Sequence, residues 1–319
     1  MIRSLLALAL FTGSVAYAQQ EGPVATQALV AFESKTAVAP TAANLTFKVE
    51  SRRAQLASLA AIPPDDVQVA LLMDDGLRLS VGREMNALRA FLTGLPAGTE
   101  VFVGYMQNGR VVPAAKFSTF TSDRAAAAQT LRIPSGIPGS SASPYFCLSD
   151  FVKNWPGNAE DQVAPSQSLQ SAPRHKARFV LMISNGVDPY NGSTSITNQD
   201  SPYVAASVSD AQRAGVPVYS IYFSDAGFRR RGGSFSGQSY LNQLAEGTGG
   251  IAFYQGIGNP VSMDPYLQQF QRALSETFVA TFPIDSKNKL VRLQVETNLP
   301  RTKVRAPQAV RPGTVVLGQ

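Results

Sequence analysis

The sequence predicts a doubly wound α/β domain with a mostly parallel β-sheet. Between residues 65 and 277, apolar runs typical of buried strands alternate with segments of helical periodicity, which is the pattern of such sheets. An Asn108-Gly109 turn inside this series predicts one antiparallel strand at the edge of the sheet. The chain has one cysteine, so its stability depends on an apolar core and on no intrachain disulfide.

Five strands are expected in the central sheet. Val67 to Met73 is a continuous apolar run that leads into Asp74-Asp75-Gly76, as a central parallel strand does at its carboxyl end. The other four strands are expected to begin near Glu100, Phe179, Val216 and Ile251. Residues 110–117 follow the Asn-Gly turn and form the expected edge strand.

Helices are expected between these strands. Apolar residues recur at helical spacing from Val81 to Leu92, and Ser122-Asp123 precede an alanine-rich segment as helix caps do. The remaining helices are expected over residues 145–153, 204–214, 238–246 and 265–277.

The segments on either side of the α/β domain lack helical periodicity. Residues 19–64 contain short alternating runs at 28–32 and 45–49, and residues 278–319 contain similar runs at 278–284, 290–297 and 302–306. We expect these two segments to pack together as a small flanking β subdomain.

Residues 1–18 have the pattern of a secretory signal peptide. Arg3 precedes the apolar run from Leu5 to Phe11, and Ala16-Tyr17-Ala18 has the small residues of a cleavage site. We therefore expect cleavage after Ala18 and a secreted or periplasmic protein. No later stretch reaches the roughly 20 apolar residues that a membrane helix needs.

Charge and residue content argue against several functions. The net charge is +6, but no basic stripe with interleaved aromatic residues indicates nucleic-acid binding, and Arg229 to Arg231 have the context of a solvated loop. His175 is the only histidine, and Cys147 lies in an apolar run that predicts a buried, unreactive thiol. Neither a zinc site nor a nucleophile paired with histidine is indicated.

The loops that follow the strands are where ligands bind in open α/β sheets. The first of these loops, Asp74 to Arg78, has neither the GxGxxG nor the GK[ST] pattern of a phosphate-binding loop. The sequence therefore does not indicate a nucleotide cofactor.

The order of these loops resembles that of the von Willebrand factor type A (VWA) domain, in particular of its secreted bacterial members. The resemblance rests on the strand ending in Asp74, the Asn-Gly hairpin, the Ser/Gly loop before residues 143–150, and the strand that runs into Ser184-Asn185-Gly186. It covers residues 67–277 and implies a Rossmann-like fold and an adhesion-type function.

The resemblance also implies where a divalent cation would bind. That family holds the cation with Asp-x-Ser-x-Ser in the first loop, a threonine in the second and an aspartate in the third. Here Asp74 keeps the first position, Gly76 and Arg78 replace the two serines, Ser143 is the counterpart of the threonine, and Asn185 replaces the last aspartate. The metal site is therefore expected to be degenerate.

We accordingly expect no metal ion and no other cofactor. Two hydroxyl ligands are missing, and the permanent cation of Arg78 opposes Mg²⁺ or Ca²⁺; we expect it to pair with Asp74 or Asp75. The alternative is a site that still holds Mg²⁺ or Ca²⁺ through Asp74, Ser143 and Asp188, with Asp75 as a substitute ligand.

Tyrosines follow prolines in three of the predicted loops. Tyr145, Tyr190 and Tyr203 suit contacts with a partner protein, although packing inside their own loops is an equal alternative. The resulting hypothesis is a secreted, non-enzymatic, protein-binding module. A metal-dependent adhesion domain and a metal- or nucleotide-dependent enzyme are the alternatives.

Overall fold

The computed structural model of the chain has a central β-sheet flanked by helices and two smaller β-sheets. It describes residues 22–36, 39–114, 117–137, 139–157, 175–190, 201–223, 233–256, 258–286 and 288–318. The predicted signal peptide 1–18 and the segment Arg229 to Arg231 lie outside these residues. No helix in the described ranges is long and apolar enough to cross a membrane.

The central sheet has six strands in the order β10-β9-β8-β5-β6-β7. All five strands expected in it are present, and the pairs among them are parallel. The hairpin strand β7 pairs antiparallel with β6 at the edge, as predicted. The strands are β5 (Val67–Asp74), β6 (Glu100–Gln107), β7 (Arg110–Pro113), β8 (Ala177–Ser184), β9 (Val218–Tyr222) and β10 (Ala252–Phe253).

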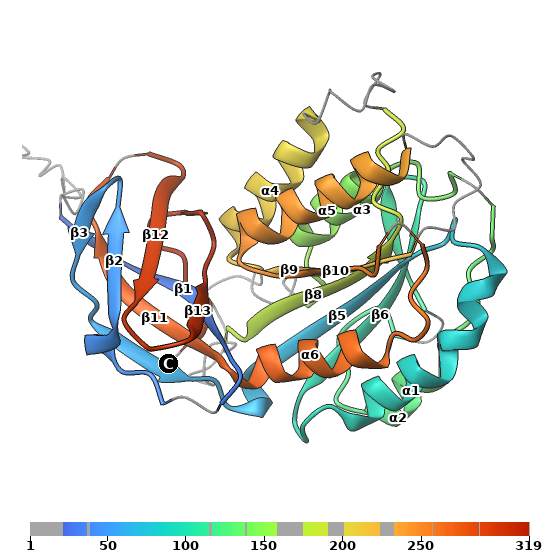
Figure 1. Ribbon diagram of the computed structural model, residues 1–319, viewed down its shortest axis with the longest axis horizontal. Helices are drawn as coiled ribbons and strands as arrows, with labels where there is room; N and C mark the ends of the chain where they lie inside the picture. Colours follow the sequence, from blue (N-terminus) through green and yellow to red (C-terminus); the bar gives the residue numbers. More distant parts are fainter. Residues whose placement is uncertain are drawn as a thin grey trace, which may run out of the picture.

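Helices cover both faces of this sheet (Figure 1). Both faces need cover because the side chains of β5 alternate between two apolar clusters. Val69 and Leu71 face the first, and Ala70 and Leu72 face the second. The first cluster includes α1 (Met85–Gly94), α2 (Arg124–Gln129) and α6 (Asp264–Ser275). The second includes α3 (Pro144–Lys153), α4 (Pro202–Ala214) and α5 (Gly233–Thr248).

Some expected boundaries are wrong. The helix expected from Val81 begins as the 3-10 helix η3 (Leu79–Glu84) and becomes α-helical only at Met85. Buried Glu84 fixes this turn, since its carboxylate accepts a hydrogen bond from the Met263 backbone N–H at 2.9 Å. Strand β7 ends at Pro113 and not at Phe117, and its place at the edge of the sheet tolerates this proline.

The remaining strands form two four-stranded sheets in the orders β13-β1-β11-β4 and β14-β12-β2-β3. Each sheet joins strands from before and after the α/β region, and one apolar cluster lies between them. The strands are β1 (Val24–Ser34), β2 (Leu45–Val49), β3 (Arg52–Ala54), β4 (Ser58–Ala61), β11 (Thr277–Ile284), β12 (Val291–Thr297), β13 (Thr302–Arg305) and β14 (Ala309–Val310). Short 3-10 turns, η1 (Ala42–Asn44) and η2 (Pro64–Asp66), precede β2 and β5.

Candidate functional site

Asp74 and Asp75 lie where β5 ends, between the ends of β6 and β8. The Asp75 backbone N–H still donates to Met106 of β6, and the Leu77 N–H turns back to the carbonyl of Asp74. This tight turn leaves both carboxyl groups buried, at 4% and 2% exposure of the residues. Their surroundings therefore decide what the site can do.

The Asp74 carboxyl is surrounded by donors from its own chain. One oxygen accepts from the Gly76 N–H at 2.9 Å, and the other accepts from the Ser184 hydroxyl at 3.0 Å. The Ser141 hydroxyl is a further hydrogen-bond partner. Burial raises the pKa of Asp74 above its ordinary value of 3.8, the hydrogen bonds oppose this rise, and the charge of Asp75 adds to it.

The Asp75 carboxylate has a cationic partner. Arg132 Nη1 and the Ser135 N–H donate to Oδ1 at 2.7 and 2.9 Å, and Gln107 donates to Oδ2 at 2.7 Å. Burial acts to raise the pKa of Asp75, but the bonds from Arg132 and Ser135 outweigh it and hold the pKa below 3.8. The pKa values of the adjacent carboxyls of Asp74 and Asp75 are thus shifted in opposite directions.

Arg132 was not among the residues selected from the sequence. Its guanidinium carbon lies 3.8 Å from the centroid of the Tyr105 ring, and its backbone N–H donates to the Tyr105 hydroxyl at 2.7 Å. Arg78, the expected partner of Asp74 or Asp75, is exposed at the start of η3. Nothing in the sequence around Arg132 marks it, because it comes to Asp75 from a loop after α2.

The loop after α2 lies across the first loop, Asp74 to Arg78. The Gly136 N–H donates to the carbonyl of Asp75 at 3.1 Å, and the Ser135 hydroxyl donates to the same carbonyl at 2.8 Å. A Cβ at Gly76 would lie only 3.1 Å from the carbonyl oxygen of Ile137. Gly76 therefore permits the close approach of the two loops, and the site is covered by the chain itself.

Ser143, the expected counterpart of the threonine ligand, has its hydroxyl in a helix cap. It caps α3, where its hydroxyl oxygen accepts from the Tyr145 N–H at 3.3 Å. The serine hydroxyls bonded to Asp74 come from Ser141 and Ser184. Capping explains the difference, since a serine immediately before a helical proline satisfies backbone donors of the first turn.

Asn185 and Asp188 lie in the third loop. Their side chains accept hydrogen bonds from that loop and from the cap of α4. The side-chain oxygen of Asn185 accepts from the Val187 N–H at 2.9 Å. Asp188 is buried and accepts from the hydroxyl of Ser201, which caps α4, at 2.7 Å. A second Asp188 oxygen accepts from the Tyr190 N–H at 3.3 Å.

These contacts use acceptor positions that a divalent cation would need. Mg²⁺ and Ca²⁺ need several oxygen ligands at once, but the oxygens of Asp74, Asp75 and Asp188 already accept hydrogen bonds. Among the described residues, no group of three or more His, Cys, Asp or Glu side chains has the arrangement of a metal site.

Cys147 is buried, as expected. Its thiol donates to the carbonyl of Ser141 at 3.3 Å, and burial together with the nearby Asp74 raises its pKa to about 12. Such a thiol is not a nucleophile near neutral pH.

The three predicted contact tyrosines separate into two groups. Tyr145 is fully buried and donates to the carbonyl of Gly186 at 2.8 Å, so its expected role as a partner contact is wrong. Tyr190 is 54% exposed, and its ring lies 5.3 Å from Phe146 and 6.4 Å from the half-buried Tyr203. We call Phe146, Tyr190 and Tyr203 the aromatic cluster.

A second set of apolar side chains is exposed beside the covered site. Leu79, Ile133 and Ile137 are 68%, 46% and 64% exposed, and we call them the apolar rim. They come from the first and second loops, which are in contact: a Cβ at Gly136 would lie 3.6 Å from Leu79. The aromatic cluster and the apolar rim both lie in segments at the carboxyl end of the central sheet.

No family model matches this chain. No curated protein matches it either. Among solved structures, the chain is similar to a von Willebrand factor type A protein from Catenulispora acidiphila, with 8% identity, 92% of this chain and 75% of the other covered, and a TM-score of 0.42.

Two further structures have comparable likeness. The VWA2 paralog of ArnB from Sulfolobus acidocaldarius is 9% identical, with 90% of this chain and 76% of that one covered and a TM-score of 0.38. Proximal thread matrix protein 1 from the mussel byssus is 12% identical, with 77% and 50% covered and a TM-score of 0.39. At these values the likenesses carry no argument about residues or function.

Proposed function

We propose that this chain is a secreted, non-enzymatic module that binds a partner protein at the carboxyl end of its central sheet, without a metal ion. The bond between Arg132 and Asp75 carries the proposal. It places a permanent cation on Asp75, the substitute metal ligand, directly beside Asp74.

The second support is the chemistry of the surrounding surface. The aromatic cluster and the apolar rim expose large apolar side chains around a core of satisfied polar groups. Tyrosine is enriched among the few residues that provide most of the binding energy in protein interfaces, and apolar side chains around it exclude water. The third is the signal-peptide pattern of residues 1–18, which favours a partner outside the cytoplasm.

Photo-crosslinking tests this proposal. Benzoylphenylalanine is placed at Tyr190 and at Ile137, and at Val24 on β1 as a control, which is 47% exposed against 54% and 64% for the two test positions. Each protein is irradiated with the secreted and envelope proteins of the source cells. We expect one common crosslinked partner at Tyr190 and Ile137, unchanged by EDTA.

Two results would contradict the proposal. An equal yield at Val24 would show that capture is unspecific, and loss of the product in EDTA would show that binding depends on a metal. The second result would favour the metal-dependent adhesion domain.

A further inference from the structure

A cavity of about 600 Å³ lies away from the strand-end site, between α6 and β9 of the α/β part and strands β1 and β13. Five cationic side chains and two carboxylates line it, a local excess of three positive charges in a chain whose net charge is +6. The charged lining residues are Lys35, Arg272, Arg301, Lys303, Arg305, Glu33 and Glu276.

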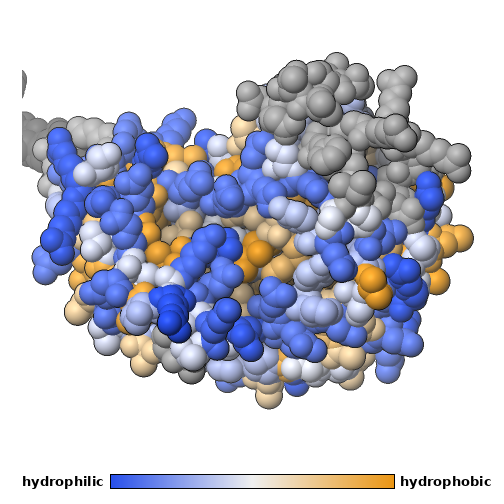
Figure 2. Space-filling view, viewed as in Figure 1, coloured by the Kyte–Doolittle hydropathy of each residue, from blue (hydrophilic) through white to orange (hydrophobic). Residues whose placement is uncertain are grey.

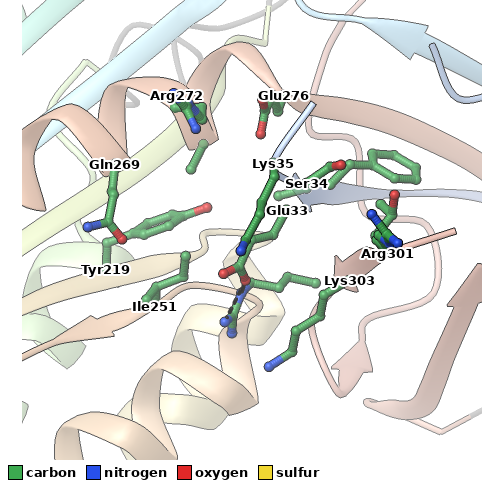
Figure 3. Close-up of a pocket in the computed structure, with 15 residues that line it drawn as sticks. Glu33, Ser34, Lys35, Tyr219, Ile251, Gln269, Arg272, Glu276, Arg301 and Lys303 are labelled. Carbon is green, nitrogen blue, oxygen red and sulfur yellow. Dashed lines mark hydrogen bonds and ion pairs between the residues drawn. The ribbon is translucent and has the colours of Figure 1, made fainter. Parts of the chain in front are cut away.

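Most of these cations are not neutralised. Arg305 is bonded to Glu33 at 2.8 Å and is only 17% exposed, so its charge is accounted for. Lys35, Arg301 and Lys303 are exposed, and no ion pair within the described ranges includes them. Figure 3 shows Lys35 reaching into the middle of the cavity, between Tyr219 and Lys303.

The walls between the charges are apolar. Tyr219, Ile251, Phe32 and Ala273 contribute to the lining, and Gln269 adds an amide. Figure 2 shows the corresponding hollow, with hydrophilic residues around a partly apolar floor. Walls of low polarity strengthen the field of clustered cations and attract anions into the cavity.

The cavity continues along the free edge of β13. A second cavity of about 300 Å³ shares Lys303 and Arg305 with the first and reaches Leu293–Val295 of β12. In the described chain, β13 pairs on one edge with β1, and β12 belongs to the other sheet. Consecutive strands thus diverge and leave a groove with unpaired backbone along one side.

We propose that this basic groove, lined by Lys35, Arg301, Lys303 and the free edge of β13, binds an extended acidic segment of a partner polypeptide. Its carboxylates face the three cations, and its backbone pairs with β13 as an added strand. Because side chains alternate along a strand, the apolar side chains of the segment point to the face opposite the cations. The inference does not rest on the strand-end surface proposed above.

Fluorescence anisotropy with a labelled octapeptide that alternates glutamate and valine tests the inference. We expect saturable binding to the full chain, and a loss of about tenfold or more in the double variant Arg301→Glu/Lys303→Glu. The control is Arg52→Glu/Lys289→Glu, which makes the same charge change at exposed positions outside the groove. It should bind as the unaltered chain does, and all three proteins should have the same circular dichroism.

Further peptides separate the contributions. A peptide with glutamine in place of glutamate should not bind, and one with N-methylated alternate amides should bind much more weakly. Equal binding to both double variants would overturn the site, and unchanged binding of the N-methylated peptide would overturn the pairing with β13. Displacement by citrate or phosphate at the peptide's own concentration, or binding only to anionic vesicles, would overturn the polypeptide as ligand.

Discussion

Arg132 Nη1 donates to Asp75 Oδ1 at 2.7 Å and so joins the loop after α2 to the end of β5. The side chain of Asp75 is 3% exposed, whereas that of Arg132 is 45% exposed. The carboxylate therefore depends on this guanidinium much more than the guanidinium depends on it.

Removing the guanidinium should destabilise the protein. Arg132→Met keeps the apolar stem over Tyr105 but leaves a buried carboxylate with fewer donors, at a cost of about 1–3 kcal/mol. Chemical denaturation measures this loss, and Arg110→Met, an exposed control on β7, should change stability by less than about 0.5 kcal/mol. Equal effects would show that the contact with Asp75 contributes nothing specific.

Asp75→Asn should flatten the acid limb of stability. The folded pKa of Asp75 is lowered, so its contribution is present above pH 3.8 and is lost as the pH falls through the folded pKa. The free energy of unfolding of the variant should therefore fall less steeply below pH 3.8. The free energy of unfolding is measured by urea denaturation at several pH values. If it falls with pH as steeply in the variant as in the parent, the lowered pKa is contradicted.

Asp74→Asn should have the opposite effect on the pH profile. The folded pKa of Asp74 is raised, so its favourable contribution is complete below pH 3.8 and declines as the pH rises through the raised pKa. In the variant this decline should disappear, and stability relative to the parent should increase above pH 3.8. A constant difference across the whole range would argue that Asp74 has an ordinary pKa.

Millimolar Mg²⁺ or Ca²⁺ should leave the melting temperature unchanged. A cation at one hundred times its dissociation constant would stabilise the folded state by about 2.7 kcal/mol, a shift of several degrees for a chain of this size. Differential scanning calorimetry with and without each cation measures the shift. A saturable increase that Asp74→Ala abolishes would mean that the site binds metal.

Gly237→Ala should destabilise the protein although it replaces glycine inside a helix. A Cβ at Gly237 would lie 2.2 Å from the carbonyl oxygen of Asn185, so α5 or the third loop would have to move, at roughly 1–3 kcal/mol. Gly94→Ala in α1 is the matched control, because its Cβ meets nothing closer than 3.6 Å. As the last residue of α1, it should gain less than the roughly 1 kcal/mol of a helix-interior position.

The central sheet could be predicted because its signals are local. A continuous apolar run followed by Asp74 has few interpretations other than a buried parallel strand, and Asp123 is recognisable as a helix cap before its hydrogen bond to Ala126 is known. By contrast, β3 and β4 are short edge strands without apolar alternation, and neither was predicted.

The candidate site was predictable in position but not in its contacts. Chain order places Asp74 and Asn185 at neighbouring strand ends, and the structure brings them there. The partner of Asp75 depends on a contact across 57 positions of sequence, so nothing near Arg132 or Arg78 distinguishes the two arginines. Tyr145 and Tyr190 both follow a proline, yet only the packing of α3 against the sheet decides that Tyr145 is buried.

The pairing of β1 with β11 affects the order in which the chain can fold. Val24 pairs with Ile284, so β1 cannot pair with β11 until residue 284 has been synthesised. The central sheet can assemble in the meantime, because all its strands lie between the two. During that interval the apolar face of β1 has no partner strand, and aggregation competes with folding.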